Sequence, residues 1–326
     1  MAAAEGWNSS DGRGAGMSRL ITVESAPGQP LGPRFPNSYE RSHWLCEELE
    51  RGNILYFPRT PFPFSPEDRE FLLGRRQTNA AYHKNVAYRP AEDRLTGLKK
   101  SDATEEGSLR AILRGYSANA TRFVMELLTP YASGLRRDLA SYRPVEERDR
   151  EARLHARNEL LHVDAFPTRP TNGDRILRIF TNLNPSKNRV WRTSETFDVF
   201  APRLVRSIGF PGPRSNMAPR RALRTVLRTL RWPGANRSPY DEFMHRLHNS
   251  LKEDSEFQAS CPKHRLEFPP NSTWIAYTDM VSHAVLEGQF AIEQTFLVSR
   301  SAMVLPGKSP ISVLEALCGY SLSSPA

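Results

Sequence analysis

The run 160–166 holds His162-Val163-Asp164 between apolar residues, and this triplet constrains the fold more than any other feature of the chain. In a β-strand, residues two apart point to the same side. A strand over this run would therefore place His162 and Asp164 on one side and pack Val163 on the other. A second strand-like run, 278–285, contributes His283, which would complete a set of two imidazoles and one carboxylate.

Two histidines and one carboxylate form the facial triad of non-haem Fe(II) oxygenases, in which three coordination positions stay open. A His-x-Asp triplet alone is weak evidence for a metal site, and a lone histidine is more often a core residue than a ligand. The strand-like setting of both runs favours the metal site here. A metal-free, cupin-like binding protein, with the histidines in its core, is the alternative.

Short β-rich runs separated by turn residues dominate the second half of the chain. They predict an α+β fold with a double-stranded β-helix core (jelly-roll, cupin-like) and supporting helices packed on one face. A helix beginning at Ser65-Pro66 and a longer one over 108–131, with a break near Gly115, precede most of these strands. The expected strands are 53–57, 160–166, 175–180, 190–193, 272–278 and 290–298.

Residues 1–36 are rich in Gly, Pro, Ser and Asn and predict a disordered tail. A single domain over 37–326 is expected to follow, with a basic helical insert at about 203–255. A capped helix beginning at Ser238-Pro239 closes this insert, and its two histidines, His245 and His248, are interpreted as part of a helix face rather than as metal ligands.

Within the insert, the segment 219–232 combines an apolar helical stripe with five arginines. A basic amphipathic helix of this kind suits an anionic membrane surface. An ordinary surface helix docked on the core is an equally weighted alternative. Replacing Arg224 and Arg228 with Glu would separate the two interpretations.

The formal net charge of +9 suits an anionic partner, such as a nucleic acid, a membrane surface or an acidic substrate. Nucleic-acid binding predicts aromatic platforms interleaved with cations, or a recognition helix after a tight turn, and neither is evident. The three cysteines are scattered and form no Cys-x-x-Cys pair, which argues against a zinc ribbon or a disulfide framework and fits a reducing cytoplasm. Residues 1–16 hold no apolar signal core, and no run is long enough to span a bilayer.

Three stretches of the chain resemble the 3-deoxy-D-manno-oct-2-ulosonic acid (Kdo) hydroxylase family. They are 162–170, the segment 173–192 with its strand Arg175-Ile176-Leu177-Arg178-Ile179-Phe180, and 279–296 around His283. The resemblance covers most of the chain from about Asn53 to Val298. The family is similar to Fe(II)- and 2-oxoglutarate-dependent dioxygenases.

The resemblance implies hydroxylation of carbon 3 of the Kdo sugar in Kdo-lipid A, which gives Ko together with succinate and carbon dioxide. It implies Fe(II), 2-oxoglutarate and O2 as cofactor and co-substrates, with His162, Asp164 and His283 as the iron ligands. It also implies a protein of the bacterial cytoplasm, with peripheral contact to the inner membrane through 219–232. A 2-oxoglutarate oxygenase acting on another anionic glycolipid or sugar acid is the alternative; no oligomeric state is predicted.

The distal carboxylate of 2-oxoglutarate needs a buried cation, best an arginine. Many relatives place this cation about ten residues after the second histidine, where this chain has Gln289 and no arginine. Arg178 is expected to take the role, with Thr295, Asn182 and Gln289 beside it. Arg175 lies an odd distance from Arg178, so only one of the two should enter the barrel. The alternative places both arginines on the surface.

An anionic sugar acid on a phosphorylated lipid would also require cations. The resemblance and the charge balance point to Arg169, Arg175 and Arg189, all close in sequence to the His-x-Asp run. These three are the predicted substrate-binding residues.

Overall fold

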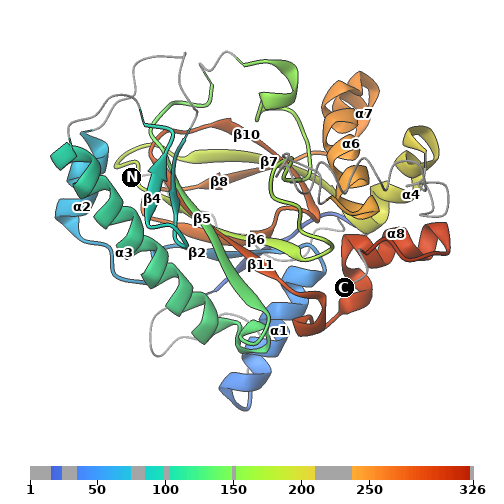
Figure 1. The fold of residues 1–326 in the computed structure, drawn as a ribbon, viewed down its shortest axis with the longest axis horizontal. Helices are drawn as coiled ribbons and strands as arrows, with labels where there is room; N and C mark the ends of the chain where they lie inside the picture. The colour runs from blue at the N-terminus through green and yellow to red at the C-terminus, as the bar shows by residue number, and fades with distance from the viewer. Residues whose placement is uncertain are drawn as a thin grey trace, which may run out of the picture.

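The computed structural model describes residues 16–23, 35–74, 85–98, 103–148, 152–209 and 237–323. Its strands form one large and one small sheet, and helices flank them (Figure 1). The strands are β1 (Leu20–Thr22), β2 (Ile54–Phe57), β3 (Val86–Arg89), β4 (Arg94–Thr96), β5 (Leu135–Arg143), β6 (Arg175–Asn182), β7 (Arg189–Thr196), β8 (His264–Phe268), β9 (Thr273–Tyr277), β10 (Val281–Glu287) and β11 (Ala291–Val298). The helices are α1 (Ser38–Glu50), α2 (Pro66–Leu73), α3 (Ala103–Leu127), α4 (Phe197–Ile208), α6 (Pro239–Glu253), α7 (Ser255–Ser260) and α8 (Pro310–Cys318).

The large sheet has the strand order β1-β2-β9-β6-β11-β5-β3-β4, and the small sheet has the order β10-β7-β8. An apolar cluster rich in aromatic rings joins strands of both sheets, so the sheets face each other across a packed layer, as expected for a double-stranded β-helix. The cluster consists of Ile54, Phe180, Trp191, Leu266, Phe268, Trp274, Ala276, Val281 and Val285.

Strand β6 lies near the centre of the large sheet and is buried along its whole length. Leu177 and Ile179 belong to the main core, whereas Phe180 packs in the aromatic layer between the sheets. Arg178 shares the face of Phe180, and its guanidinium carbon lies 4.9 Å from the centre of that ring. The predicted alternation is therefore observed, and Arg178 is the arginine that enters between the sheets.

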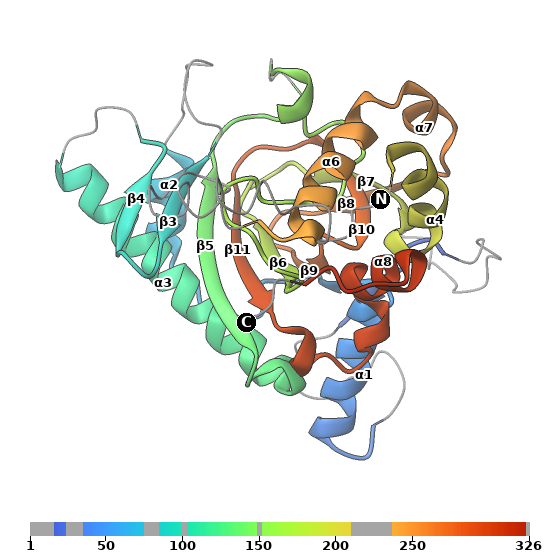
Figure 2. The ribbon, with the colours of Figure 1, turned by 45° about the vertical axis from the view of Figure 1, so that its right-hand side comes forward.

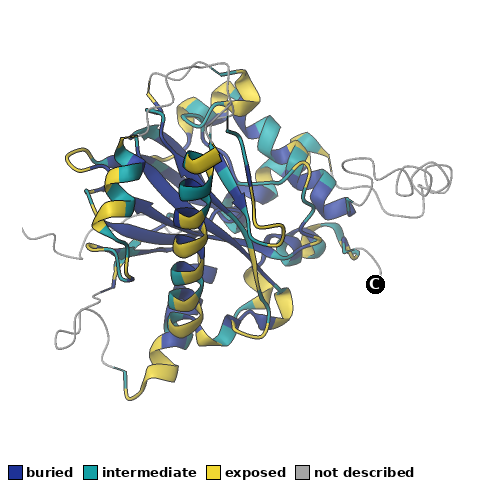
Figure 3. Ribbon diagram, turned by 60° about the vertical axis from the view of Figure 1, so that its left-hand side comes forward, coloured by how far each residue is buried: buried dark blue, intermediate teal, exposed yellow. Residues whose placement is uncertain are grey.

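Helices α1 and α3 cover the outer face of the large sheet (Figure 2). The inward face of α3 is buried, and its outward face is exposed (Figure 3). α3 runs through Gly115 without the predicted break. Leu113 and Tyr116 on either side of Gly115 are both buried, and this packing outweighs the roughly 1 kcal/mol by which Gly disfavours a helix.

A second group of helices, α4, α6, α7 and α8, gathers at one end of the two sheets, where α4 contacts β7 (Figure 1). α6 begins as predicted, because Ser238 and Asp241 form a reciprocal capping box and Pro239 takes the first helical position.

The run 160–166 forms no strand, so the strand predicted there is wrong. His162 makes an isolated antiparallel bridge with His283. One residue earlier, the backbone of Leu161 pairs with a side chain instead of a strand: its N–H donates to Gln258 Oε1 at 3.0 Å, and its carbonyl accepts from Gln258 Nε2 at 2.9 Å.

The expected disordered tail over 1–36 is wrong for part of its length. Leu20–Thr22 form β1, which pairs in parallel with β2 at the edge of the large sheet. Val23, directly after β1, is buried in the core. Ile21 and Thr22 of β1 are β-branched, and such residues are common in strands. The basic segment 219–232 lies outside the described residues.

Candidate active site

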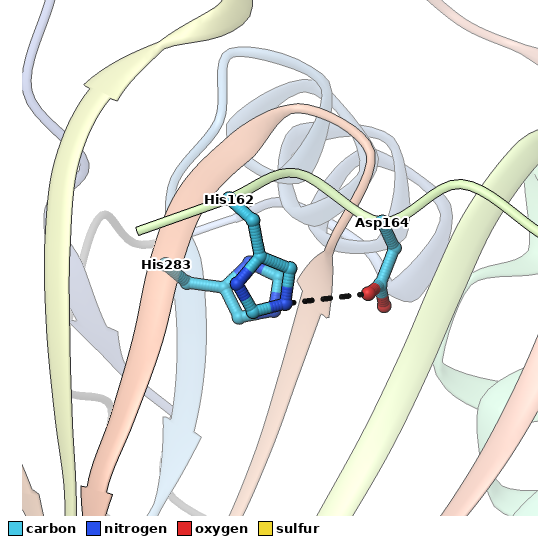
Figure 4. A group of neighbouring side chains, drawn as sticks. All are labelled: His162, Asp164 and His283. Carbon is cyan, nitrogen blue, oxygen red and sulfur yellow. Dashed lines mark ion pairs between the residues drawn. The ribbon is translucent and has the colours of Figure 1, made fainter. Parts of the chain in front are cut away.

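The two histidine segments are fastened to each other through their backbones. The N–H of His162 donates to the carbonyl of His283 at 3.0 Å, and the N–H of His283 donates to the carbonyl of His162 at 2.9 Å. The N–H of Asp164 donates to the carbonyl of Thr278 at 2.8 Å, in the turn before β10. Segments far apart in the sequence thus bring the predicted triad together (Figure 4).

Both histidines are oriented in the same way. Nδ1 of His162 lies 2.7 Å from the carbonyl of Leu160, and Nδ1 of His283 lies 2.8 Å from the carbonyl of Val281. A carbonyl only accepts, so Nδ1 carries the proton in both rings and Nε2 keeps its lone pair for a ligand. One ligand atom from each histidine and one from Asp164 lie within 4.8 Å of one another.

The surroundings favour the protonation states that a metal requires. Burial lowers the pKa of His162 well below its usual value, and His283 and Lys252 lower it further. Burial also lowers the pKa of His283. Burial raises the pKa of Asp164, but the Arg178 guanidinium, the two histidines and a hydrogen bond from Thr278 together outweigh this effect and hold the pKa well below its usual range. Neutral imidazoles and an ionised carboxylate are the forms that coordinate a divalent metal.

A cavity of about 330 Å³ opens beside His162 and Asp164, within the size range of ligand sites. One wall is the inner face of the large sheet, and the other comes from α6 and from the short 3-10 helix Leu154–Ala156. Four cationic side chains line the cavity against two carboxylates, so it suits anionic ligands. The cations are Arg143, Arg169, Arg178 and Lys252, and the carboxylates are Asp164 and Glu293.

Two of the predicted co-substrate residues lie together in this cavity. Arg178 on β6 and Thr295 on β11 are direct cross-strand partners, and both line the cavity. Arg178 Nη1 donates to Asp164 Oδ2 at 2.6 Å, and Nη2 donates to Glu293 Oε1. The predicted cation therefore also contacts the predicted metal ligand.

Arg169 is the one predicted substrate-binding residue that lines the cavity. Its guanidinium carbon lies 4.1 Å from the centre of the Phe166 ring, and it forms an ion pair with Asp138. Burial lowers the pKa of Arg169 to about 10, and the nearby cation Arg178 adds to this effect. Arg169 thus remains charged at neutral pH.

The other predicted binding residues lie outside the lining of this cavity. Arg175 is fully buried on the opposite face of β6, where it forms a bidentate ion pair with Asp279 at 2.8 and 3.2 Å. Asn182 donates to the carbonyls of Lys187 and Phe268, and Gln289 donates to the carbonyl of Pro144. Arg189 donates to the carbonyl of Gly288 and to Glu147. These contacts give the side chains structural roles.

The cavity is also lined by His248, which the sequence analysis interpreted as part of a helix face, and by Lys252, which it did not single out. Nδ1 of His248 lies 2.7 Å from the carbonyl of Val163, and its ring centre lies 5.0 Å from that of His162. Lys252 Nζ donates to the carbonyl of His155 at 2.9 Å. One signal was available: on α6 the row of residues four apart begins with buried apolar Tyr240 and Met244 and continues with these two polar side chains.

Comparison with known proteins gives a consistent family assignment. The sequence profile of the 3-deoxy-D-manno-oct-2-ulosonic acid (Kdo) hydroxylase family matches residues 35–321. Among curated proteins, no significant match is found.

Solved structures of the Kdo hydroxylase KdoO, described as a non-heme Fe(II) α-ketoglutarate-dependent dioxygenase, are similar to this chain. The complex with α-ketoglutarate and Fe(III) is 33% identical with a TM-score of 0.78, and the complex with cobalt(II) is 34% identical with a TM-score of 0.79. The complex with succinate and Fe(III) is 33% identical with a TM-score of 0.77. Each match covers 94% of this chain and 98% of the other.

Proposed function

Because this chain belongs to the Kdo hydroxylase family and is an Fe(II)- and 2-oxoglutarate-dependent dioxygenase that hydroxylates Kdo, we propose that its substrate is Kdo-lipid A and its product the 3-hydroxylated sugar Ko. The reaction converts 2-oxoglutarate and O2 to succinate and carbon dioxide while a C–H bond at carbon 3 becomes C–OH. The single observation that carries the proposal is the triad His162, Asp164 and His283 at the edge of a cationic cavity.

The iron ligands in this proposal are Nε2 of His162, Nε2 of His283 and one carboxylate oxygen of Asp164. The residues fit such an ion, because both Nδ1 atoms are already engaged with carbonyls and the carboxylate is held ionised. Two imidazoles and one carboxylate are the donor set of non-haem Fe(II) oxygenases. Bound Fe(II) supplies the redox chemistry, and the protein orients the reactants and excludes side reactions.

Arg178 and Thr295 are the proposed site for the distal carboxylate of 2-oxoglutarate. They are neighbours across β6 and β11 in the wall of the cavity. A guanidinium has five N–H donors, and the contacts of Arg178 with Asp164 and Glu293 use two of them. Donors therefore remain for a third carboxylate, while the Thr295 hydroxyl adds a neutral contact.

Arg169 and Lys252 are the proposed anchors for the anionic sugar. They reach the cavity from the loop after Asp164 and from α6, whereas Arg178 projects from β6 of the large sheet. Lys252 is 4% exposed, so an ammonium–carboxylate contact there would be little screened by water. The sugar would thus be held by side chains of the loop and of α6, and 2-oxoglutarate by side chains of β6 and β11.

Membrane contact is a further part of the proposal. No helix among the described residues is long and apolar enough to cross a membrane. Kdo-lipid A is a membrane lipid, and we propose peripheral contact with the cytoplasmic face of the bacterial inner membrane through the basic segment 219–232.

A reconstitution experiment tests the function. Purified protein is loaded anaerobically with Fe(II) and 2-oxoglutarate, then given oxygen and Kdo-lipid A, and the products are measured by mass spectrometry. We expect succinate release and the gain of one oxygen atom in the lipid, both lost in His162→Ala. Succinate without lipid oxidation would keep the oxygenase and reject this substrate. Neither product, from protein shown to hold iron, would point to a binding protein without catalysis.

A further inference from the structure

The contact between Arg178 and Asp164 is the first link of a buried chain of alternating charges. Arg143 grips Glu293 through two donors, Nε and Nη2, each at 3.0 Å from a carboxylate oxygen. Arg143 Nη1 also lies 3.5 Å from Glu147, which accepts from Arg189 at 3.3 Å. The chain, called here the buried ion chain, consists of Asp164, Arg178, Glu293, Arg143, Glu147 and Arg189.

The buried ion chain holds three carboxylates and three guanidinium groups, of which all but the partly exposed Asp164 are buried. Glu293 is 2% exposed, and Arg143 and Arg178 are each 9% exposed. Removing such charges from water is costly, and well-packed apolar residues often stabilise a fold as well or better. The chain also starts at a predicted metal ligand, and four of its six members line the cavity, so its position points to a role at the site.

The contacts of Asp164 distinguish its two oxygens. Oδ2 accepts from Arg178 Nη1 at 2.6 Å, whereas Oδ1 faces His162 Nε2 at 3.8 Å. A metal placed between the histidines and Asp164 would therefore meet Oδ1 alone. One-oxygen coordination leaves three positions open on a six-coordinate ion, which 2-oxoglutarate and O2 require.

We propose that Glu293 is a positioning residue, which holds Arg178 on the outer oxygen of Asp164 and so keeps Asp164 coordinated through one oxygen. Arg143 fixes Glu293 in turn through its two-point grip. This inference rests on the proposed iron site. It assigns to Glu293 a function that neither the metal ligands nor the substrate cations provide.

The loss of the Glu293 charge should act on the metal through Arg178. In Glu293→Gln, Arg178 would lose its second carboxylate and keep only Asp164 and the face of Phe180. Arg143 would at the same time lose the carboxylate that it shares with Arg178, so the two guanidinium groups would repel each other more strongly. Both changes would displace Arg178 and free Oδ2 of Asp164 to compete for the metal.

Anaerobic Co(II) titration of the full-length protein, followed by visible absorption, tests this inference. For Glu293→Gln we expect Co(II) affinity to fall by about 10-fold or more, as for other changes behind metal ligands, and the Co(II) bands to change in position or intensity. Glu293→Asp, which keeps the negative charge, should restore part of the Co(II) affinity and part of the original Co(II) spectrum. Glu287→Gln is the matched control, because Glu287 forms its ion pair with Arg148 on the surface, outside the chain.

The outcomes are distinguishable. If the unaltered protein binds no Co(II), the proposed iron site fails and this inference fails with it. If it binds Co(II) but folded Glu293→Gln shows the same affinity and spectrum, the inference alone is overturned. If Glu293→Gln does not fold, Arg178→Lys is the deciding variant, because lysine keeps the positive charge but lacks the two guanidinium NH2 groups that contact Asp164 and Glu293. An unchanged Co(II) spectrum in Arg178→Lys would overturn the inference, and an altered spectrum would support it.

Discussion

His162 and His283 exchange both backbone hydrogen bonds, at 3.0 and 2.9 Å. This reciprocal pair sets the separation of the two imidazoles through the main chain, before any metal binds. The rings then lie with centres 4.7 Å apart. A site that is built in this way should form in the folded protein without iron and bind the ion with little rearrangement.

Asp164→Asn should abolish stoichiometric iron binding while the protein stays folded. The amide removes the charge that complements a divalent ion, but it keeps the shape of the side chain. Iron content after anaerobic reconstitution and circular dichroism are the measurements. His245→Gln is the control, because His245 lies on α6 but does not line the cavity. Full iron occupancy in Asp164→Asn would contradict the ligand assignment.

Trp191 should support His283 from behind. Its ring stacks on the imidazole with centres 5.1 Å apart and planes 20° apart, and Trp191 is 1% exposed. Trp191→Ala should lower the free energy of unfolding by about 3–5 kcal/mol, as for other buried aromatic truncations, and should weaken Co(II) binding.

Urea denaturation and Co(II) titration measure the two effects. Trp274→Phe is the comparison, because Trp274 belongs to the same aromatic layer but contacts Trp191 rather than His283. It should reduce stability with little change in Co(II) affinity. Equal losses of Co(II) affinity in both variants would show that Trp191 acts only through the fold.

The triad and the class of fold were predictable because each depends on local pattern. His162 and Asp164 lie two apart, so period-two reasoning placed them on the same side. For Arg175 and Arg178 the same reasoning predicted only that one of the two enters between the sheets, and it did not choose which. The helix N-cap at Ser65 was also predicted correctly, since the Ser65 side chain accepts a hydrogen bond from the N–H of Asp68.

The rest of the site depends on contacts between distant segments, which pattern does not encode. Glu293 and Arg143 meet only because β11 pairs with β5, and His248 reaches the triad only because α6 packs across it. The prediction of a strand over 160–166 was wrong for a similar reason. The Gln258 side chain, from a distant segment, forms the two hydrogen bonds with the backbone of Leu161 that a neighbouring strand would form.

Lys252→Met should weaken binding of the sugar substrate without affecting the metal. Loss of a buried ammonium–carboxylate contact of about 1.5–3 kcal/mol predicts a KM for Kdo-lipid A raised by about 10-fold or more. Co(II) affinity and the KM for 2-oxoglutarate should stay unchanged. Lys263→Met is the control, because Lys263 also donates to backbone carbonyls but lies outside the cavity. A raised KM for 2-oxoglutarate instead would assign Lys252 to the co-substrate.

Replacing Arg224 and Arg228 with Glu should weaken binding to anionic vesicles. Each arginine near such a surface contributes about 1 kcal/mol, so reversal of two charges should reduce vesicle binding by more than 10-fold. Vesicle co-sedimentation at low and physiological salt is the measurement, with Co(II) affinity as the control for an intact site. Unchanged vesicle binding would favour the surface-helix interpretation of 219–232.

Glu293 should also contribute to the acid sensitivity of the metal-free protein. Burial raises its pKa, but Arg143 and Arg178 outweigh this and lower the pKa below its ordinary value of 4.5. The unfolded chain therefore takes up the proton at higher pH than the folded protein does. The stabilisation is fully present above about pH 4.5 and is lost as the pH falls through the folded-state pKa. Each unit of lowering corresponds to about 1.4 kcal/mol.

Glu293→Gln removes this titration, so its free energy of unfolding should fall less steeply with acid than that of the unaltered protein. The gap between the two proteins, measured by urea denaturation from about pH 6 to about pH 3, should narrow as the pH falls. The histidines of the site titrate in both proteins, so their contribution largely cancels in the comparison. A gap that stays constant across this range would mean that Glu293 has the same pKa in the folded and unfolded chains, which its contacts with Arg143 and Arg178 oppose.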